Sequence, residues 1–197
     1  MKMISEMFIT AVYTVFVQNL VFNAGLGMSE AIRASAKPGR FAKLAVMISG
    51  FSVVTSVICS LLDKLEAFTD ISYAVRAAVY GGVLAVVYLI TAVVARFIFK
   101  VQPNFLGVLG VAALNTLVLA VPYINNSAAY SFADSIGSGI GAGVAFVLAA
   151  ALIGKGSERL NANEKIPDVF KGAPAMLIYV GLLSLAFAGF TDSTLFT

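Results

Sequence analysis

Three amide side chains stand inside the first long uncharged stretch of the chain, where a membrane helix would carry only apolar residues. They are Gln18, Asn19 and Asn23, and they are followed by Gly25 and Gly27. Amides in a bilayer interior are costly unless they find partners, and glycine weakens a helix. Such groups can join the ends of a broken helix, or coordinate a weakly held cation through oxygen.

A second stretch of the same character, 114–122, lies about half a chain later. It carries Asn115 and Thr116 within an apolar run and ends at Pro122. The similarity of the two stretches predicts two broken helices that meet near the membrane midplane.

The composition places these stretches in a membrane protein. Of 197 residues, 60% are hydrophobic and only 12% are charged, which predicts an all-α integral membrane protein with a single domain, 1–197. The net charge of +3 is no sign of nucleic-acid binding, because the basic residues lie in short loops. Histidine is absent, and the single cysteine, Cys59, has no internal partner for a disulfide.

Six uncharged stretches are long enough to cross a bilayer, which takes about 20 residues per helix. The fourth is cut from a longer run, 101–133, in which we expect the helix to break at Pro122 and leave a wetter tail. The six predicted spans are 7–29, 44–62, 77–95, 104–122, 135–154 and 172–191.

The basic residues of the connecting loops predict the orientation. One side carries ten of them: Arg33, Lys37, Arg40, Lys43, Arg96, Lys100, Lys155, Arg159, Lys165 and Lys171. The other side carries three: Lys2, Lys64 and Arg76. The positive-inside rule places the ten in the cytoplasm and both termini outside.

The amide-bearing breaks also suggest an internal repeat. Spans one and four hold the breaks, so residues 1–100 and 101–197 would form two copies of three spans each. Three is an odd number, so the second copy would be inverted, and inverted repeats place functional sites at the midplane. The alternative is that any six-span protein looks repetitive.

Span five is rich in small residues, with Ser135, Gly139 and Gly143 spaced by four. This spacing favours close helix packing, although a glycine track that lines a substrate path is an alternative. Asp134, at the start of this span, is the acid nearest to the membrane interior. It fits an acid at a helix N-terminus or a member of an ion pathway. Glu30 and the other carboxylates are assigned to loops or span ends.

The C-terminal third reads ERL at 158–160 and PDVFKGAPAMLIYVGLLSLAFAGF at 167–190. These two runs resemble the end of the Rnf/Nqr membrane subunits. Asn19-Leu20-Val21, Gly25-Leu26 and Asn115 fit the family's two breaks. The chain is most similar to the branch that includes the A-type subunit of the Rnf electron-transport complex and the E-type subunit of the Na⁺-translocating NADH:quinone oxidoreductase.

The resemblance implies six transmembrane helices in inverted repeats, with half-helices in spans one and four. It also implies a bacterial or archaeal cytoplasmic (inner) membrane, a homologous membrane partner resembling the E-type Rnf protein, and further Rnf subunits. In the family, each half-helix gives one cysteine to a [2Fe-2S] cluster shared with that partner. The complex couples NADH or ferredoxin oxidation to Na⁺ or H⁺ movement.

This sequence departs from the family at both cysteines, because Gly27 and Thr116 occupy those positions. Iron–sulfur clusters require thiolates, and Cys59 matches no ligand position. We therefore expect that this chain holds no cluster and no metal. We also expect it to be a divergent, non-catalytic subunit of an Rnf-type ion pump. The alternatives are reuse of the fold as a small transporter or ion-conducting subunit, and a membrane anchor without electron transfer.

Overall fold

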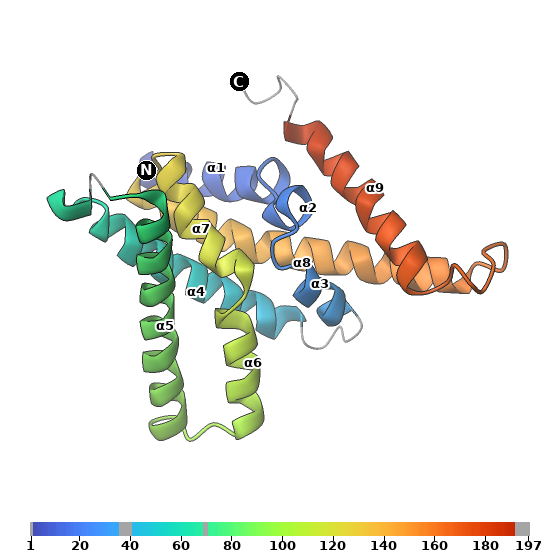
Figure 1. Cartoon of the computed structure of the whole chain (residues 1–197), viewed down its shortest axis with the longest axis horizontal. Coiled ribbons are helices and arrows are strands. Elements are labelled where there is room, and N and C mark those ends of the chain that lie inside the picture. Colours follow the sequence, from blue (N-terminus) through green and yellow to red (C-terminus); the bar gives the residue numbers. More distant parts are fainter. Residues whose placement is uncertain (1, 36–40, 69–70, 192–197) are drawn as a thin grey trace.

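The computed structural model describes residues 2–35, 41–68 and 71–191, and helices are the only regular secondary structure in this part of the chain (Figure 1). The predicted all-α class is therefore confirmed. The predicted loop residues Lys37, Arg40, Asp70 and Asp192 lie outside the described residues. The helices are α1 (Lys2–Phe16), α2 (Leu20–Ala24), α3 (Met28–Ser35), α4 (Phe41–Leu62), the 3₁₀ turn η2 (Glu66–Phe68), α5 (Tyr73–Phe97), α6 (Pro103–Ala113), α7 (Thr116–Ser127), α8 (Phe132–Ala162) and α9 (Ala173–Thr191).

Among the described residues, five helical stretches are long and apolar enough to cross a membrane. They are 42–62, 73–97, 103–127, 132–162 and 173–191, the third of which includes the interruption between α6 and α7. The first predicted span, 7–29, is instead divided among α1, α2 and α3, the longest of which has 15 residues. The breaks expected in spans one and four are therefore both present as interruptions of the helix.

The break expected at Pro122 was wrong. Pro122 is buried inside α7, which continues to Ser127, so the interruption of this span lies earlier, between Ala113 and Thr116. Proline removes only one backbone donor. In membrane helices the freed carbonyl and the local bend are tolerated where neighbouring helices pack around them.

Helix α8 forms the centre of the molecule and contacts α1 and α4 most extensively (Figure 1). Its glycines permit this approach: a Cβ at Gly141 would stand 2.7 Å from the carbonyl oxygen of Ala11, and one at Gly139 would stand 2.8 Å from Cα of Val53. The packing interpretation of the small residues in span five is therefore supported by the structure.

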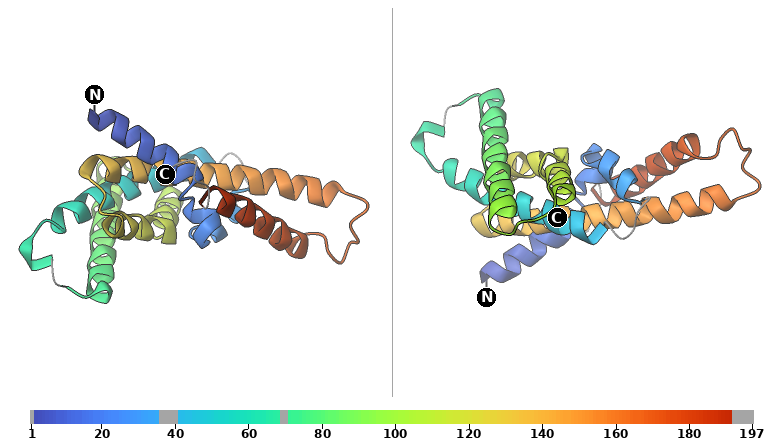
Figure 2. Two further views of the ribbon diagram at one scale, coloured as in Figure 1. Left: turned by 90° about the horizontal axis from the view of Figure 1, so that it is seen from above. Right: turned by 90° about the horizontal axis from the view of Figure 1, so that it is seen from below.

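Helices α5 and α9 lie at the periphery. Only 11% of the 18-residue apolar stretch of each of these helices is buried, against 61% of the corresponding stretch of α8. Both helices stand out from the central group of helices in the views of Figure 2. Such exposed apolar faces are typical of helices that contact lipid.

Candidate functional site

The first break is built around Asn19, which is fully buried. Its Nδ2 donates to the carbonyl oxygen of Val15 (2.8 Å) near the end of α1. Its Oδ1 accepts from the backbone amides of Val21 (3.1 Å) and Phe22 (3.2 Å) at the start of α2. One side chain thus satisfies backbone groups on both sides of the interruption, as a helix that is broken within lipid requires.

The rest of this break is closed by Gln18 and Asn23. Asn23 Nδ2 donates to the carbonyl oxygen of Val17 (2.8 Å), which also accepts from the Thr191 hydroxyl (3.3 Å) of α9. Gln18 Oε1 accepts from the Tyr130 hydroxyl (3.3 Å). Burial, with Tyr13 and Asp134 nearby, raises the pKa of Tyr130 above its usual range, so the phenol remains a neutral donor at pH 7.

The second break lies between α6 and α7 and uses the same device. Asn115 caps α7, with its Oδ1 accepting from the backbone amide of Leu117 at 2.9 Å. Asn115 is 4% exposed, and its Nδ2 has no hydrogen-bond partner among the described residues. Because the cap requires the amide oxygen to face the helix, the amide nitrogen is the atom that has no hydrogen-bond partner among the described residues.

The two breaks touch. The backbone amide of Gly27 donates to the Thr116 hydroxyl oxygen at 3.0 Å. Gly27 has a φ of +73°, and a Cβ at this position would stand 2.9 Å from Asn115 Oδ1 and 3.2 Å from Leu117 Cβ. Only glycine combines this left-handed backbone with so close an approach. We call this contact between Gly27, Asn115 and Thr116 the junction.

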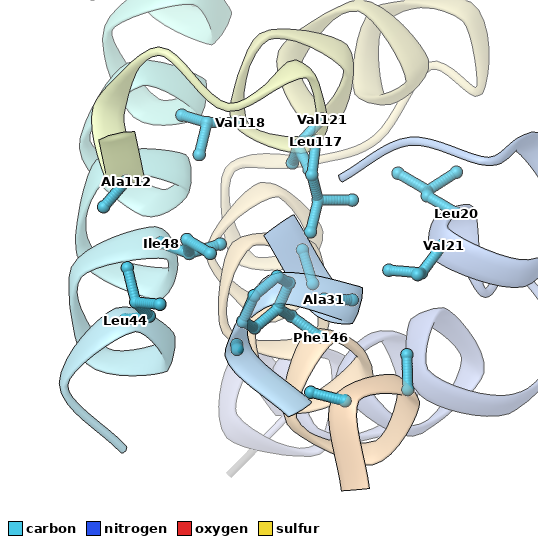
Figure 3. Close-up of a cluster of buried hydrophobic side chains, with 14 of the residues drawn as sticks. Leu20, Val21, Ala31, Leu44, Ile48, Ala112, Leu117, Val118, Val121 and Phe146 are labelled. Carbon is cyan, nitrogen blue, oxygen red and sulfur yellow. The ribbon is translucent and has the colours of Figure 1, made fainter. Parts of the chain in front are cut away.

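A buried apolar cluster surrounds the breaks and holds them in place (Figure 3). It brings residues from both divided spans around Phe146 of α8, which is fully buried. Its members include Leu20, Val21, Ala31, Ala112, Leu117, Val118 and Val121.

The structure brings together only part of the set predicted from the sequence. Gly27, Asn115 and Thr116 meet at the junction, whereas Gln18, Asn19 and Asn23 act at the other end of α2. A cavity of about 450 Å³ lies beside the junction, lined in part by Ser29, Glu30, Tyr88, Asn115 and Thr116. Nothing in the sequence pattern predicted this cavity.

Glu30, assigned to a span end, lies in the first turn of α3 and pairs with Arg33 at 3.3 Å. The sequence signal that could have found it is its position three residues after Gly27. A helix that restarts at the break places the acid of its first turn beside that break.

Sequence comparison identifies the relatives of this chain. The profile of the Rnf-Nqr subunit family, described as membrane proteins, matches residues 7–193. The chain belongs to the Rnf-Nqr family. Its relatives include the A-type subunits of the ion-translocating oxidoreductase complexes of Pseudoalteromonas translucida (32% identical), Pasteurella multocida (31%) and Vibrio vulnificus (32%). Each comparison covers 95% of this chain and 97% of the relative.

The junction of this Rnf-Nqr chain does not fit the [2Fe-2S] cluster that the resemblance implies. Gly27 has no side chain, and a cysteine there would place its Cβ within 3 Å of Asn115 Oδ1. The Thr116 hydroxyl oxygen already accepts from Gly27. The one thiol, Cys59, is buried in α4, and the described residues contain no group of three or more His, Cys, Asp or Glu side chains placed to hold a metal.

Proposed function

We propose that this chain is the A-type membrane subunit of an Rnf-type ion-translocating electron-transport complex, with a junction that holds itself together without a cluster. The observation that carries the proposal is the hydrogen bond from Gly27 to Thr116. It joins the two positions at which the resemblance places the cluster cysteines, in a chain matched along 95% of its length by A-type relatives.

The chemistry of the breaks supports this proposal. An interrupted helix in lipid must satisfy its free backbone groups within the protein, because each unsatisfied group costs several kcal/mol. Here Asn19 and Asn115 cap the restarting helices, and Thr116 accepts the amide of Gly27. The broken helices therefore do not need a metal group to hold their ends.

The proposed setting follows from the family and the charge pattern. The chain would lie in a bacterial or archaeal inner membrane with both termini outside, as inverted copies 1–100 and 101–197. Its partners would be the lipid bilayer, a homologous E-type Rnf protein and other Rnf subunits. The exposed apolar faces of α5 and α9 support contact with lipid or with such a partner.

The test is to purify the complex from its native membranes through an affinity tag on this chain. We expect other Rnf subunits to copurify, and we expect no [2Fe-2S] signal that depends on this chain. Iron and acid-labile sulfide analysis with EPR spectroscopy would measure the second point, with Cys59→Ser as the control. A stoichiometric cluster signal that survives Cys59→Ser and disappears without this chain would refute the cluster-free junction.

A second candidate is a small transporter or ion-conducting subunit without electron transfer. The cavity beside the junction favours it, because Glu30 and Asn115 both line this cavity. The amide nitrogen of Asn115 also has no hydrogen-bond partner among the described residues. Proteoliposomes that contain only this chain would distinguish the two. Uptake of Na⁺ or H⁺ that stops in Glu30→Gln supports this candidate, and no uptake above that of protein-free vesicles argues against it.

A further inference from the structure

The C-terminal run 167–190, which resembles the end of the Rnf/Nqr subunits, lies largely in α9 and takes no part in the junction. Among the described residues, α9 has its extensive contacts with α8 and α2. Figure 1 and Figure 2 show α9 starting near the C-terminal end of α8 and bringing its own C-terminal end to α2. The helix therefore connects the loop after α8 with the first break.

The first attachment of α9 is a close contact with α8. The ring of Tyr179 packs so tightly on Gly156 that a Cβ at Gly156 would stand 2.0 Å from a carbon of the ring. The Tyr179 hydroxyl also donates to the carbonyl oxygen of Leu152 at 3.2 Å. Gly156 is buried, so this contact fixes the N-terminal half of α9 against α8.

The second attachment joins the C-terminal end of α9 to the first break. The ring centroids of Phe187 and Phe22 lie 4.5 Å apart, and both side chains are buried. The Thr191 hydroxyl donates to the carbonyl oxygen of Val17 at 3.3 Å and accepts from Asn23 Nδ2 at 3.4 Å. The end of α9 therefore covers the part of α2 that carries Phe22 and Asn23.

This second attachment is weaker than the cap inside the break. Asn19 is fully buried, and its bond to the Val15 carbonyl oxygen measures 2.8 Å. Thr191 and Asn23 are both exposed, and the hydrogen bonds of Thr191 are longer than the usual range of about 2.5–3.2 Å. Lipid is as apolar as a phenylalanine ring, so helices in a bilayer gain little hydrophobic free energy by pairing such rings. The end of α9 can therefore leave the break while the Asn19 cap stays formed.

The backbone between α2 and the junction can absorb such a movement. Gly25 has a φ of +69°, and a Cβ there would meet nothing within 4 Å. Gly27, two residues later, is held by its hydrogen bond to Thr116 and by the close approach of Asn115. Because glycine has the greatest backbone freedom, a shift of α2 can end at Gly25 without disturbing the junction.

We propose that the C-terminal end of α9 is a releasable clamp on the first break. In the closed state, Phe187 and Thr191 position α2. In the released state, α9 turns about its contact at Tyr179 and uncovers Phe22 and Asn23. The clamp goes beyond the proposed function and rests on contacts within this chain alone. It therefore stands or falls separately from assembly with Rnf subunits and from the absence of a cluster.

The experiment measures the distance between spin labels on α9 and α1 by pulsed EPR, with the full-length chain in nanodiscs. Cys59→Ser removes the native thiol. Leu185→Cys and Phe8→Cys carry the labels, because these side chains are 71% and 70% exposed. We expect two distances, which correspond to the closed and released states.

The ratio of released to closed chains then tests the residues of the clamp. Thr191→Val should raise this ratio roughly 3- to 18-fold, the range expected from the loss of one interhelical hydrogen bond in a membrane. Thr191→Ser should restore the ratio, because it keeps the hydroxyl. Phe187→Ala should also raise the ratio, because it removes the contact with Phe22.

The matched controls change the same chemical groups away from the clamp. Thr91→Val removes a hydroxyl that donates to the Val87 carbonyl oxygen within α5, and Leu182→Ala shortens an exposed apolar side chain of α9. Both should leave the ratio unchanged.

Two results would overturn the clamp. One is a single distance in the labelled chain, even if the clamp variants lower the melting temperature, because Phe187 and Thr191 would then have a structural role only. The other is a ratio in Thr191→Val equal to that in Thr91→Val. If Phe187→Ala does not fold, the comparison of Thr191→Val with Thr191→Ser decides the question.

Discussion

The substitution Gly27→Ala tests the junction most directly. The backbone at Gly27 has a φ of +73°, which costs a residue with a Cβ roughly 1–2 kcal/mol. The new methyl would also stand 2.9 Å from Asn115 Oδ1 and 3.2 Å from Leu117 Cβ. Overpacking of this kind costs about 1–3 kcal/mol. We therefore expect a total loss of roughly 2–5 kcal/mol in the free energy of unfolding.

The chain supplies its own control two residues earlier. Gly25 has a φ of +69°, nearly the same backbone, but a Cβ there would meet nothing within 4 Å. Gly25→Ala should therefore lose only the roughly 1–2 kcal/mol of the left-handed conformation. The backbone cost is common to both variants. The difference between their losses in the free energy of unfolding therefore measures the cost of the close contact between the breaks.

The assay is reversible unfolding of the purified chain in mixed detergent micelles, followed by circular dichroism. Thr116→Val completes it, because it leaves the Gly27 amide without its acceptor and should cost about 1–3 kcal/mol, whereas Thr116→Ser should keep the bond. Equal destabilisation by Gly25→Ala and Gly27→Ala, together with a neutral Thr116→Val, would show that the breaks do not depend on contact with each other.

Two further predictions concern the buried amide and the packing of α8. Asn19→Leu should lower the free energy of unfolding by about 2–4 kcal/mol, because three hydrogen bonds from the buried Asn19 side chain to the backbone are lost. Its control is Tyr13→Leu, on the half-exposed face of α1, which should change the melting temperature little. Gly141→Ala should lower the melting temperature through overlap with the Ala11 carbonyl oxygen, whereas Gly181→Ala in α9, with nothing within 4 Å, should leave it unchanged or raise it. Thermal melts of the four variants check both, and a melting temperature for either test variant equal to that of its control would contradict the corresponding reasoning.

The breaks themselves were predictable, and their partners were not. Asn19 and Asn115 each precede an apolar run that restarts a helix, and asparagine at such a position is a strong cap. The prediction at Pro122 failed because the sequence shows the lost backbone donor but not the helices packed around it. The sequence predicted that the two breaks meet, but it did not predict the hydrogen bond from the Gly27 amide to the Thr116 hydroxyl across 89 positions, because a single sequence does not specify which atoms come into contact.

By itself, the sequence determined that this is an all-α membrane protein of the Rnf-Nqr kind, because hydrophobic length and motif are local properties of the chain. It also determined that the two positions expected to carry thiolates have none. The tertiary structure decided that the backbone amide of Gly27 donates to the hydroxyl oxygen of Thr116. The physical reason is that such contacts depend on the close approach of helices along α8, which the spacing of small residues permits but does not specify.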